Sequence, residues 1–293
     1  MQRYWYKYLV YLSLVFLMVA LYRADYLVIP KITSFYCLTG SFVFMFGGFA
    51  ADALSWRSIL NTSDFRANTR ECFASVGLSI FAKYIPGKVL VIVGRAAYIS
   101  EQMSYPLGTI SLLSLNAQFI SLWIGLTLGT TGLFILGELL IWKWLILFLW
   151  TSLTVIIFSK VVHVLLENTI KSVFHKEILI PQLNVKSILK VMPWFLACWG
   201  CWGIGFYFLA SSLQTQYVPI VTVLIYPLCG TLGILAVIAP GGIGVREGLI
   251  TGCLVMTGLP VTEAAAVSVA SRLWFLIGEI FIFIYGWILD FRK

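Results

Sequence analysis

The sequence predicts an all-α polytopic membrane protein, and three observations support this class. Of the 293 residues, 60% are hydrophobic and only 11% are charged, whereas soluble domains carry about 25% charged residues. Residues 191–245 contain no Asp, Glu, Lys or Arg, although a helix needs only roughly 20 apolar residues to cross a bilayer. The mean hydropathy of the whole chain is +0.96. We predict a single transmembrane domain over residues 1–293, with about six spanning helices and two re-entrant helical hairpins.

The spanning helices are predicted from the uninterrupted apolar runs in chain order, at residues 4–22, 33–54, 106–136, 139–158, 191–212 and 262–289. The first run is not followed by a small-residue cleavage site, so we interpret it as a retained helix and not as a signal peptide. The basic segment at 159–190 carries apolar residues at helical spacing, which favours a helix resting on the membrane surface.

Two further apolar elements, at residues 73–100 and 218–258, are interrupted by turn-forming residues. The arms of the first have about a dozen residues each, which is too short to cross a hydrocarbon core of roughly 30 Å. We predict a re-entrant hairpin at both places, and a proline-kinked spanning helix is the alternative at the first. The glycines are expected to supply turn geometry and close approach. The predicted hairpin turns contain Pro86, Gly87, Pro240, Gly241, Gly242 and Gly244.

The distribution of Lys and Arg predicts the orientation in the membrane. With both hairpins re-entrant, one side of the bilayer has only Arg23, Lys31 and Lys143. The other side collects Arg3, Lys7, Arg57, Arg66, Arg70, Lys160, Lys171, Lys176, Lys186, Lys190, Arg292 and Lys293. Basic residues accumulate on the cytoplasmic side, so both termini are expected to be cytoplasmic. A spanning segment at 73–100 would nearly erase this bias.

The layout also predicts an inverted-topology repeat, with halves at approximately 1–136 and 139–293. The two Pro-Gly breaks, at Pro86 and Pro240, lie 154 residues apart, and the flanking helices are offset by nearly the same amount. Each half therefore consists of two helices, a broken hairpin and a third helix. In transporters, paired interrupted segments of this kind mark a binding site near the bilayer midplane.

Cationic residues that follow the two breaks are the strongest candidates for binding a substrate. Lys88 and Arg95 follow the first break and share a helical face, because they are seven residues apart. Arg246 follows the second break, in the first turn of a helix, where it opposes the helix dipole and so favours an anionic partner. A guanidinium group can donate two hydrogen bonds to one phosphate. We therefore predict a lipid phosphate between the two hairpins.

Other polar residues in apolar segments have structural interpretations of comparable weight. Arg272 and Glu279 share a face of the last helix, so they are candidates for a substrate site, a gate or an internal ion pair. Glu247 suits the positive end of its own helix, and Lys83 suits a helix C-terminus. Asn116 and Gln118 are typical of hydrogen bonds between membrane helices. No pattern indicates a metal, a cofactor or nucleic acid as a ligand.

The two motifs around the breaks resemble a known family. Tyr84-Ile-Pro-Gly-Lys88 with Gly94-Arg95, followed later by Pro240-Gly-Gly-Ile-Gly-Val-Arg-Glu247, is similar to the lysylphosphatidylglycerol synthase transmembrane-region family. This family includes the flippase part of the bacterial multiple peptide resistance factor. The resemblance implies a flippase-like fold in a prokaryotic cytoplasmic (inner) membrane and movement of aminoacylated phospholipids or polyprenyl-linked intermediates. It does not imply aminoacyl transfer, because these 293 residues contain no soluble synthase domain. Matching positions are Pro86, Gly87, Lys88, Arg95, Pro240, Gly241, Gly242, Arg246 and Glu247.

Three classes of function follow from these observations. The first is a transporter or flippase for an anionic phospholipid or a polyprenyl-phosphate-linked lipid, with its headgroup between the hairpins. The second is an integral-membrane transferase acting on lipid-linked substrates in cell-envelope glycan synthesis, although its candidate carboxylates form no close pair in the sequence: Asp52, Glu101, Glu247 and Glu279. The third is an accessory protein that positions a synthase or glycosyltransferase.

Overall fold

The computed structural model describes residues 31–85, 89–137, 140–159, 184–236 and 239–291. Every regular element within these ranges is helical, which confirms the all-α class. Several predicted features lie outside the described residues: the helix at 4–22, most of the basic segment at 159–190, the turn residues Pro86 and Gly87, and the candidate substrate-binding residue Lys88.

Four of the described helices are long and apolar enough to cross a membrane: α2 (Phe35–Thr62), α5 (Leu107–Leu136), α8 (Val185–Leu213) and α11 (Val261–Phe291). Each has 28 to 31 residues, or roughly 42–46 Å at 1.5 Å per residue. A fifth predicted span corresponds to α6 (Leu140–Phe158), which has 19 residues.

Side-chain caps fix two of the helix starts. The Ser34 hydroxyl accepts a hydrogen bond from the Cys37 amide at the start of α2, and the Asn184 side chain accepts one from the Ser187 amide at the start of α8, 2.8 Å away. The predicted limits at 54 and 191 were wrong, since α2 extends to Thr62 and α8 begins at Val185. Arg57 and Lys190 mark the edges of the apolar segments near these two limits, but the helical backbone continues past both residues.

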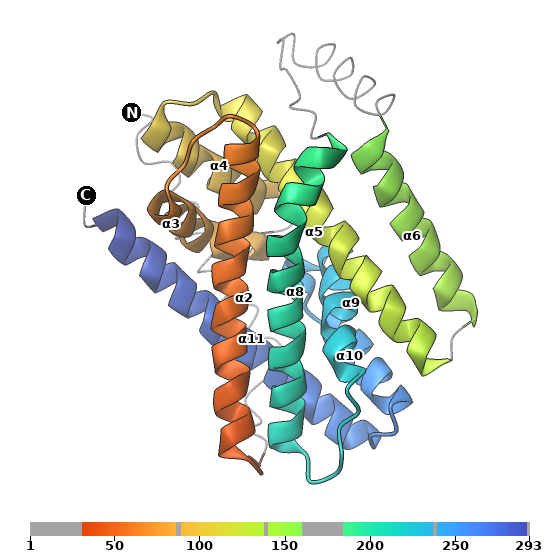
Figure 1. Ribbon diagram of the computed structural model, residues 1–293. Helices are drawn as coiled ribbons and strands as arrows, with labels where there is room; N and C mark the ends of the chain where they lie inside the picture. The colour runs from red at the N-terminus through yellow and green to blue at the C-terminus, as the bar shows by residue number, and fades with distance from the viewer. Residues whose placement is uncertain (1–30, 86–88, 138–139, 160–183, 237–238, 292–293) are drawn as a thin grey trace.

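Among the described helices, the most extensive contact is between α2 and α8, which run side by side (Figure 1). Small residues allow the close approach. A Cβ atom added at Gly48 of α2 would clash with the indole of Trp202 on α8, and one added at Gly205 of α8 would lie 3.1 Å from the Ser41 carbonyl oxygen. The two helices therefore form a closely packed pair.

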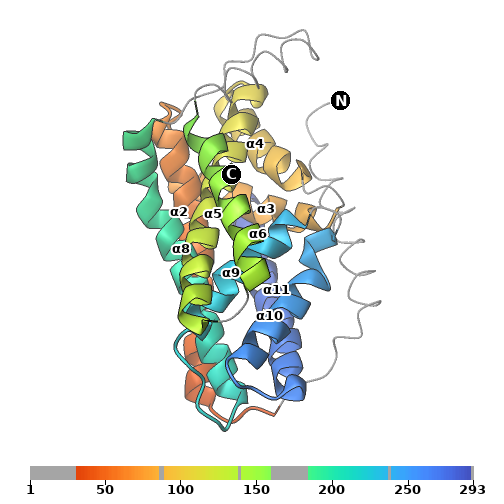
Figure 2. The same cartoon turned by 90° about the vertical axis from the view of Figure 1, so that its right-hand side faces the viewer.

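The remaining helices lie on one side of this pair (Figure 2), and four of them form two similar sets. In one set α3 (Thr69–Ser79) packs on α11 and α4 (Val89–Met103) packs on α5. In the other set α9 (Thr222–Leu235) packs on α5 and α10 (Val245–Met256) packs on α11. The outer helix α6 packs on α5, where the Trp123 indole donates to the Thr154 hydroxyl at 2.9 Å.

The helical backbone is interrupted near both predicted positions. The 3₁₀ turn η1 (Ile80–Tyr84) follows α3, and Ile85 is extended before α4 begins. The turn η2 (Pro240–Gly242) lies between α9 and α10. Gly241 and Gly244 have φ angles of 60° and 82°, a left-handed region that favours glycine. The turns η1 and η2 contact each other, so the two interruptions meet inside the molecule.

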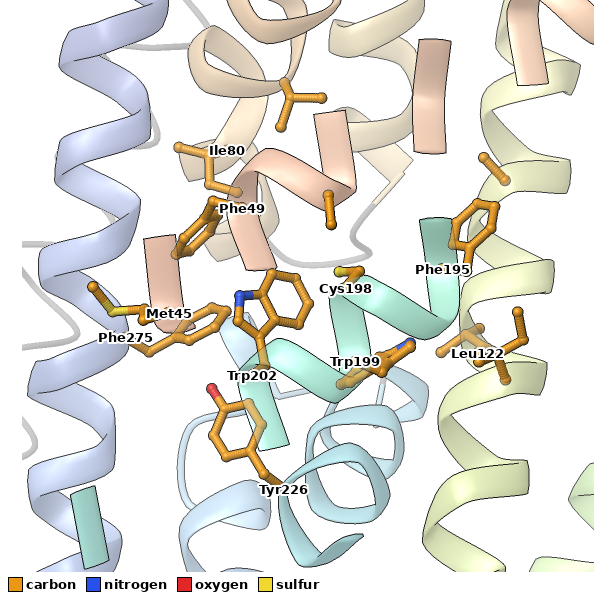
Figure 3. Close-up of a cluster of buried hydrophobic side chains, with 14 of the residues drawn as sticks. Met45, Phe49, Ile80, Leu122, Phe195, Cys198, Trp199, Trp202, Tyr226 and Phe275 are labelled. Atoms are coloured by element: carbon orange, nitrogen blue, oxygen red, sulfur yellow. The ribbon is translucent and has the colours of Figure 1, made fainter. Parts of the chain in front are cut away.

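Aromatic side chains from four helices fill the space next to these turns (Figure 3). The ring of Trp202 on α8 has its centroid 5.4 Å from that of Phe49 on α2 and 5.1 Å from that of Phe275 on α11. Tyr226 of α9 lies 5.8 Å from Phe275. Such edge-to-face and tilted contacts stabilise a core beyond simple burial of area. This cluster forms one wall of a cavity.

Candidate functional site

A cavity of about 350 Å³ lies among α2, the two interrupted elements, α5, α8 and α11. Most of its lining is aliphatic or aromatic, as is usual for ligand sites that hold a few convergent polar groups. The charged residues of the lining, within the described part of the chain, are Asp52, Lys83, Arg95, Arg246 and Arg272. A cavity with four cations and one carboxylate in its wall is suited to an anion.

Arg246, Glu247 and Arg272 form a buried cluster beside the second interruption. The guanidinium nitrogens lie 3.7 Å (Arg246 Nη2) and 3.9 Å (Arg272 Nη1) from Oε1 of Glu247. The other carboxylate oxygen of Glu247 accepts a hydrogen bond from the Gly244 amide at 2.7 Å, which stabilises the start of α10. Arg272 Nη1 donates to the Gly241 carbonyl at 3.0 Å. Two arginines thus share one carboxylate.

Four nitrogens of these two guanidinium groups are buried and lack a hydrogen-bond acceptor. They are Nε and Nη2 of Arg246 and Nε and Nη2 of Arg272, and Oε1 of Glu247 also lacks a donor. Because most buried polar atoms in proteins are hydrogen-bonded, unpaired donors on two neighbouring arginines indicate a place for an anionic ligand.

Glu279 of α11 is bound to the first interruption. Its Oε1 lies 2.6 Å from Lys83 Nζ and its Oε2 accepts a hydrogen bond from the Tyr84 hydroxyl at 2.7 Å. The Glu279 residue is 1% exposed. The ring of Tyr84 also lies 5.2 Å from the guanidinium carbon of Arg272. Lys83, Tyr84 and Glu279 therefore hold η1 against α11, next to the arginine cluster.

Arg95 of α4 occupies a separate position on the cavity wall. Its Nε and Nη2 donate to the Ser114 hydroxyl at 3.2 and 3.1 Å, and Nη2 also donates to the Ser114 carbonyl. The guanidinium carbon lies 4.5 Å from the ring centroid of Trp56 on α2, a cation–π distance. The partners of Arg95 are thus neutral, and its positive charge is available to the cavity.

The structure brings most of the sequence-predicted site residues together. Arg246, Glu247 and Arg272 are in contact, Glu279 lies beside them, and Arg95 lines the same cavity. Lys88 lies outside the described residues. The side chain of Gln118 also lines the cavity.

Sequence reasoning missed the site roles of Tyr84, Ser114 and Tyr226, and it did not connect Asp52 with the cationic residues. Tyr84 belongs to the first motif, which was a usable signal. Tyr226 accepts a hydrogen bond from Arg246 Nη1 at 3.4 Å, and nothing in its local sequence indicates this. Within the described residues no group of three His, Cys, Asp or Glu side chains could hold a metal ion.

The fold and the charged cavity define a multi-pass helical membrane protein with polar groups gathered at interrupted helices. The family model described as lysylphosphatidylglycerol synthase TM region matches residues 4–285, and the chain belongs to this family. Searches of curated proteins and of solved structures gave no match. Membership of this family associates the chain with membrane domains that have a lipid-related role.

Proposed function

We propose that this protein is a transporter that moves an anionic phospholipid or a polyprenyl-phosphate-linked lipid across the prokaryotic cytoplasmic membrane. The observation that carries this proposal is the set of four unpaired guanidinium nitrogens of Arg246 and Arg272 next to a cavity at the meeting point of two interrupted helices. Buried charges inside membrane domains are costly and usually mark substrate pathways.

The chemistry of the cluster favours a phosphate group as the ligand. Arginine presents a planar fork of donors that matches two phosphate oxygens at once. Because Arg246 and Arg272 share the single carboxylate of Glu247, one positive charge in the cluster is not compensated. A phosphodiester carries one negative charge and would compensate it, while the apolar part of the lining would accept the first carbons of the lipid.

The proposed mechanism is alternating exposure of this site by two halves of opposite topology. In support, the helix contacts correspond when the halves are exchanged: α3 on α11 matches α9 on α5, and α4 on α5 matches α10 on α11. Both interrupted elements have short arms of 11 to 15 helical residues, which favours re-entrant hairpins over spans. Rocking of one half against the other would expose the headgroup to each side in turn.

The experiment that tests this proposal is a headgroup-accessibility assay in liposomes containing the purified protein. Fluorescent anionic phospholipids and a short polyprenyl phosphate are compared side by side. We expect faster transbilayer movement of one class, and loss of that movement in Arg246→Ala. The matched control is Arg66→Ala, because Arg66 is exposed and makes no described side-chain contact with the cavity.

Two results would contradict the proposal. Full transport by Arg246→Ala would exclude the arginine cluster as the headgroup site. Binding of lipid without transport by the unmodified protein would favour an accessory role beside a synthase or glycosyltransferase.

A further inference from the structure

Asp52 is a carboxylate in the wall of the cavity, and none of the described residues forms a hydrogen bond or an ion pair with it. It lies in the apolar part of α2, is half-buried and lines the cavity. Glu247 and Glu279 each accept at least one hydrogen bond and approach a cation within 4 Å. In the part of the chain that the structure describes, the Asp52 carboxylate makes neither a hydrogen bond nor an ion pair. Keeping an ionisable group in this position costs free energy, and such groups in membrane segments usually have a function.

The groups around Asp52 are mainly positive, and the two cations that act on it most directly are each bound to another residue. Arg95 of α4 and Lys83 of η1 act on it through their charge, and from α8 the neighbouring titratable group is Cys198. Arg95 is hydrogen-bonded to Ser114 and Lys83 is paired with Glu279. Across the cavity, α9 contributes Tyr226, α10 contributes Arg246 and α11 contributes Arg272. From α3 and α5 the lining is uncharged, with Ser79, Gln118 and Ser121.

The charges of the site show what a proton on Asp52 would change. Among the described residues of the site, four cations (Lys83, Arg95, Arg246 and Arg272) and three carboxylates (Asp52, Glu247 and Glu279) leave one net positive charge. Protonation of Asp52 raises this to two. An anion in the cavity would repel the Asp52 carboxylate and favour its protonated form, and by reciprocity the proton would favour binding of the anion.

We propose that Asp52 is the proton-binding site of this transporter and takes up one proton when an anionic headgroup enters the cavity. The inference rests on the proposed function. The step converts the carboxylate and one proton from water into a neutral carboxylic acid, and the proton returns to water when the lipid leaves on the other side. A phosphodiester and its proton then cross the bilayer without net charge, so that a pH gradient can drive transport and the membrane potential does not oppose it.

The test measures binding of short-chain phosphatidylglycerol, an anionic phosphodiester, to the full chain in detergent between pH 5.5 and 8.5. Binding is followed by the change in intrinsic tryptophan fluorescence of the protein, to which Trp199 and Trp202 contribute because they line the cavity. We expect affinity to fall by up to about tenfold per pH unit as pH rises, which is the slope for one linked proton. Short-chain phosphatidylcholine, which has no net charge, should show no such slope.

Three variants isolate Asp52 from the other titratable groups. Asp52→Asn should bind with an affinity that no longer depends on pH, and Asp52→Glu should keep the pH dependence. Glu101→Gln is the matched control, because Glu101 is exposed on α4 and does not line the cavity, and it should behave as the unmodified protein. An unchanged slope in Asp52→Asn would overturn the inference.

A measurement on the unmodified protein covers the case in which Asp52→Asn does not fold. Calorimetry in buffers of different ionisation enthalpy counts the protons taken up per bound lipid, and we expect one. A count of zero, with binding intact, overturns the role of Asp52 but leaves the proposed transport in place. A complete lack of lipid binding at every pH overturns both.

Discussion

Both the backbone conformation and the close packing at position 241 require a glycine. Its φ angle of 60° is in the left-handed region, and a Cβ atom there would lie 2.6 Å from Cε1 of Tyr84. The carbonyl of Gly241 also accepts the hydrogen bond from Arg272. This glycine is therefore the point where the second interruption, the first interruption and α11 touch.

We expect Gly241→Ala to lower the free energy of unfolding by about 1–3 kcal/mol, the usual range for a strained backbone conformation. The measurement is unfolding of the purified protein in detergent. The control is Gly248→Ala in α10, where an added Cβ atom meets nothing within 4 Å and alanine is favoured over glycine by roughly 0.5–1 kcal/mol. Equal stability of the two variants would contradict this account of Gly241.

The ion pair between Lys83 and Glu279 gives a second prediction. Lys83→Met leaves the Glu279 carboxylate buried without its cation, so we expect a loss of about 3–5 kcal/mol of unfolding free energy. Combining Lys83→Met with Glu279→Gln removes both charges, and the double variant should be more stable than Lys83→Met alone. A double-mutant cycle by unfolding in detergent measures this coupling, and additive losses would exclude a direct interaction.

The site residues differ in how well the sequence revealed them. Arg95, Arg246 and Arg272 are conspicuous as charges within apolar segments, and the Pro-Gly break before Arg246 predicts that this residue lies at a helix start. Asp52 is equally visible as a charge, but whether it faces lipid, protein or a cavity depends on how α3 and α8 pack on α2. Ser114 gives no signal at all, because a serine in an apolar helix usually bonds its own backbone.

At the scale of elements, the existence of each helix was more predictable than its limits. Apolar length predicted α2, α5, α8 and α11, and Pro-Gly pairs predicted the two interruptions. Charged residues were poor markers of helix ends, because Lys186 and Lys190 lie inside α8, where the helix continues beyond the apolar segment. Pro193 also lies within α8, since neighbouring helices can compensate for the lost hydrogen bond.

The contact between α5 and α9 depends on a glycine and gives a prediction at this scale. A Cβ atom added at Gly129 would lie 2.5 Å from Cβ and 2.6 Å from Cα of Leu228, so the two helices would have to separate. We expect Gly129→Ala to be less stable than the unmodified protein by about 1–3 kcal/mol, the usual cost of overpacking. Gly200→Ala in α8 is the control, as an added Cβ atom there meets nothing within 4 Å; unfolding in detergent compares them.

For the whole molecule, the distribution of basic residues predicts an orientation that can be measured. In intact cells, a membrane-impermeant thiol reagent should label Lys143→Cys and should leave Lys190→Cys unlabelled until the membrane is opened. The unsubstituted chain is the control for its six cysteines. The reverse labelling pattern would invert the proposed topology and place both termini outside.

The architecture of the whole molecule was predictable from spacing more than from residue identity. The offset of 154 residues between the Pro-Gly pairs predicted two halves of similar layout, and the helix contacts of α3, α4, α9 and α10 are consistent with this layout. This layout also led us to expect a site between the two hairpins, but nothing local to either turn indicates that η1 and η2 touch each other directly.

The length of α11 has a consequence for the lipid around the protein. Its 31 residues extend roughly 46 Å, well beyond a hydrocarbon core of about 30 Å, and the helix runs obliquely across α2 and α8 (Figure 1). A helix that is too long for its bilayer adjusts by tilting. Because α11 carries both Arg272 and Glu279, a change in its tilt would move the two groups that hold the interrupted helices. Acyl-chain length, and with it bilayer thickness, should therefore change the rate of the proposed transport even when the headgroup is unchanged.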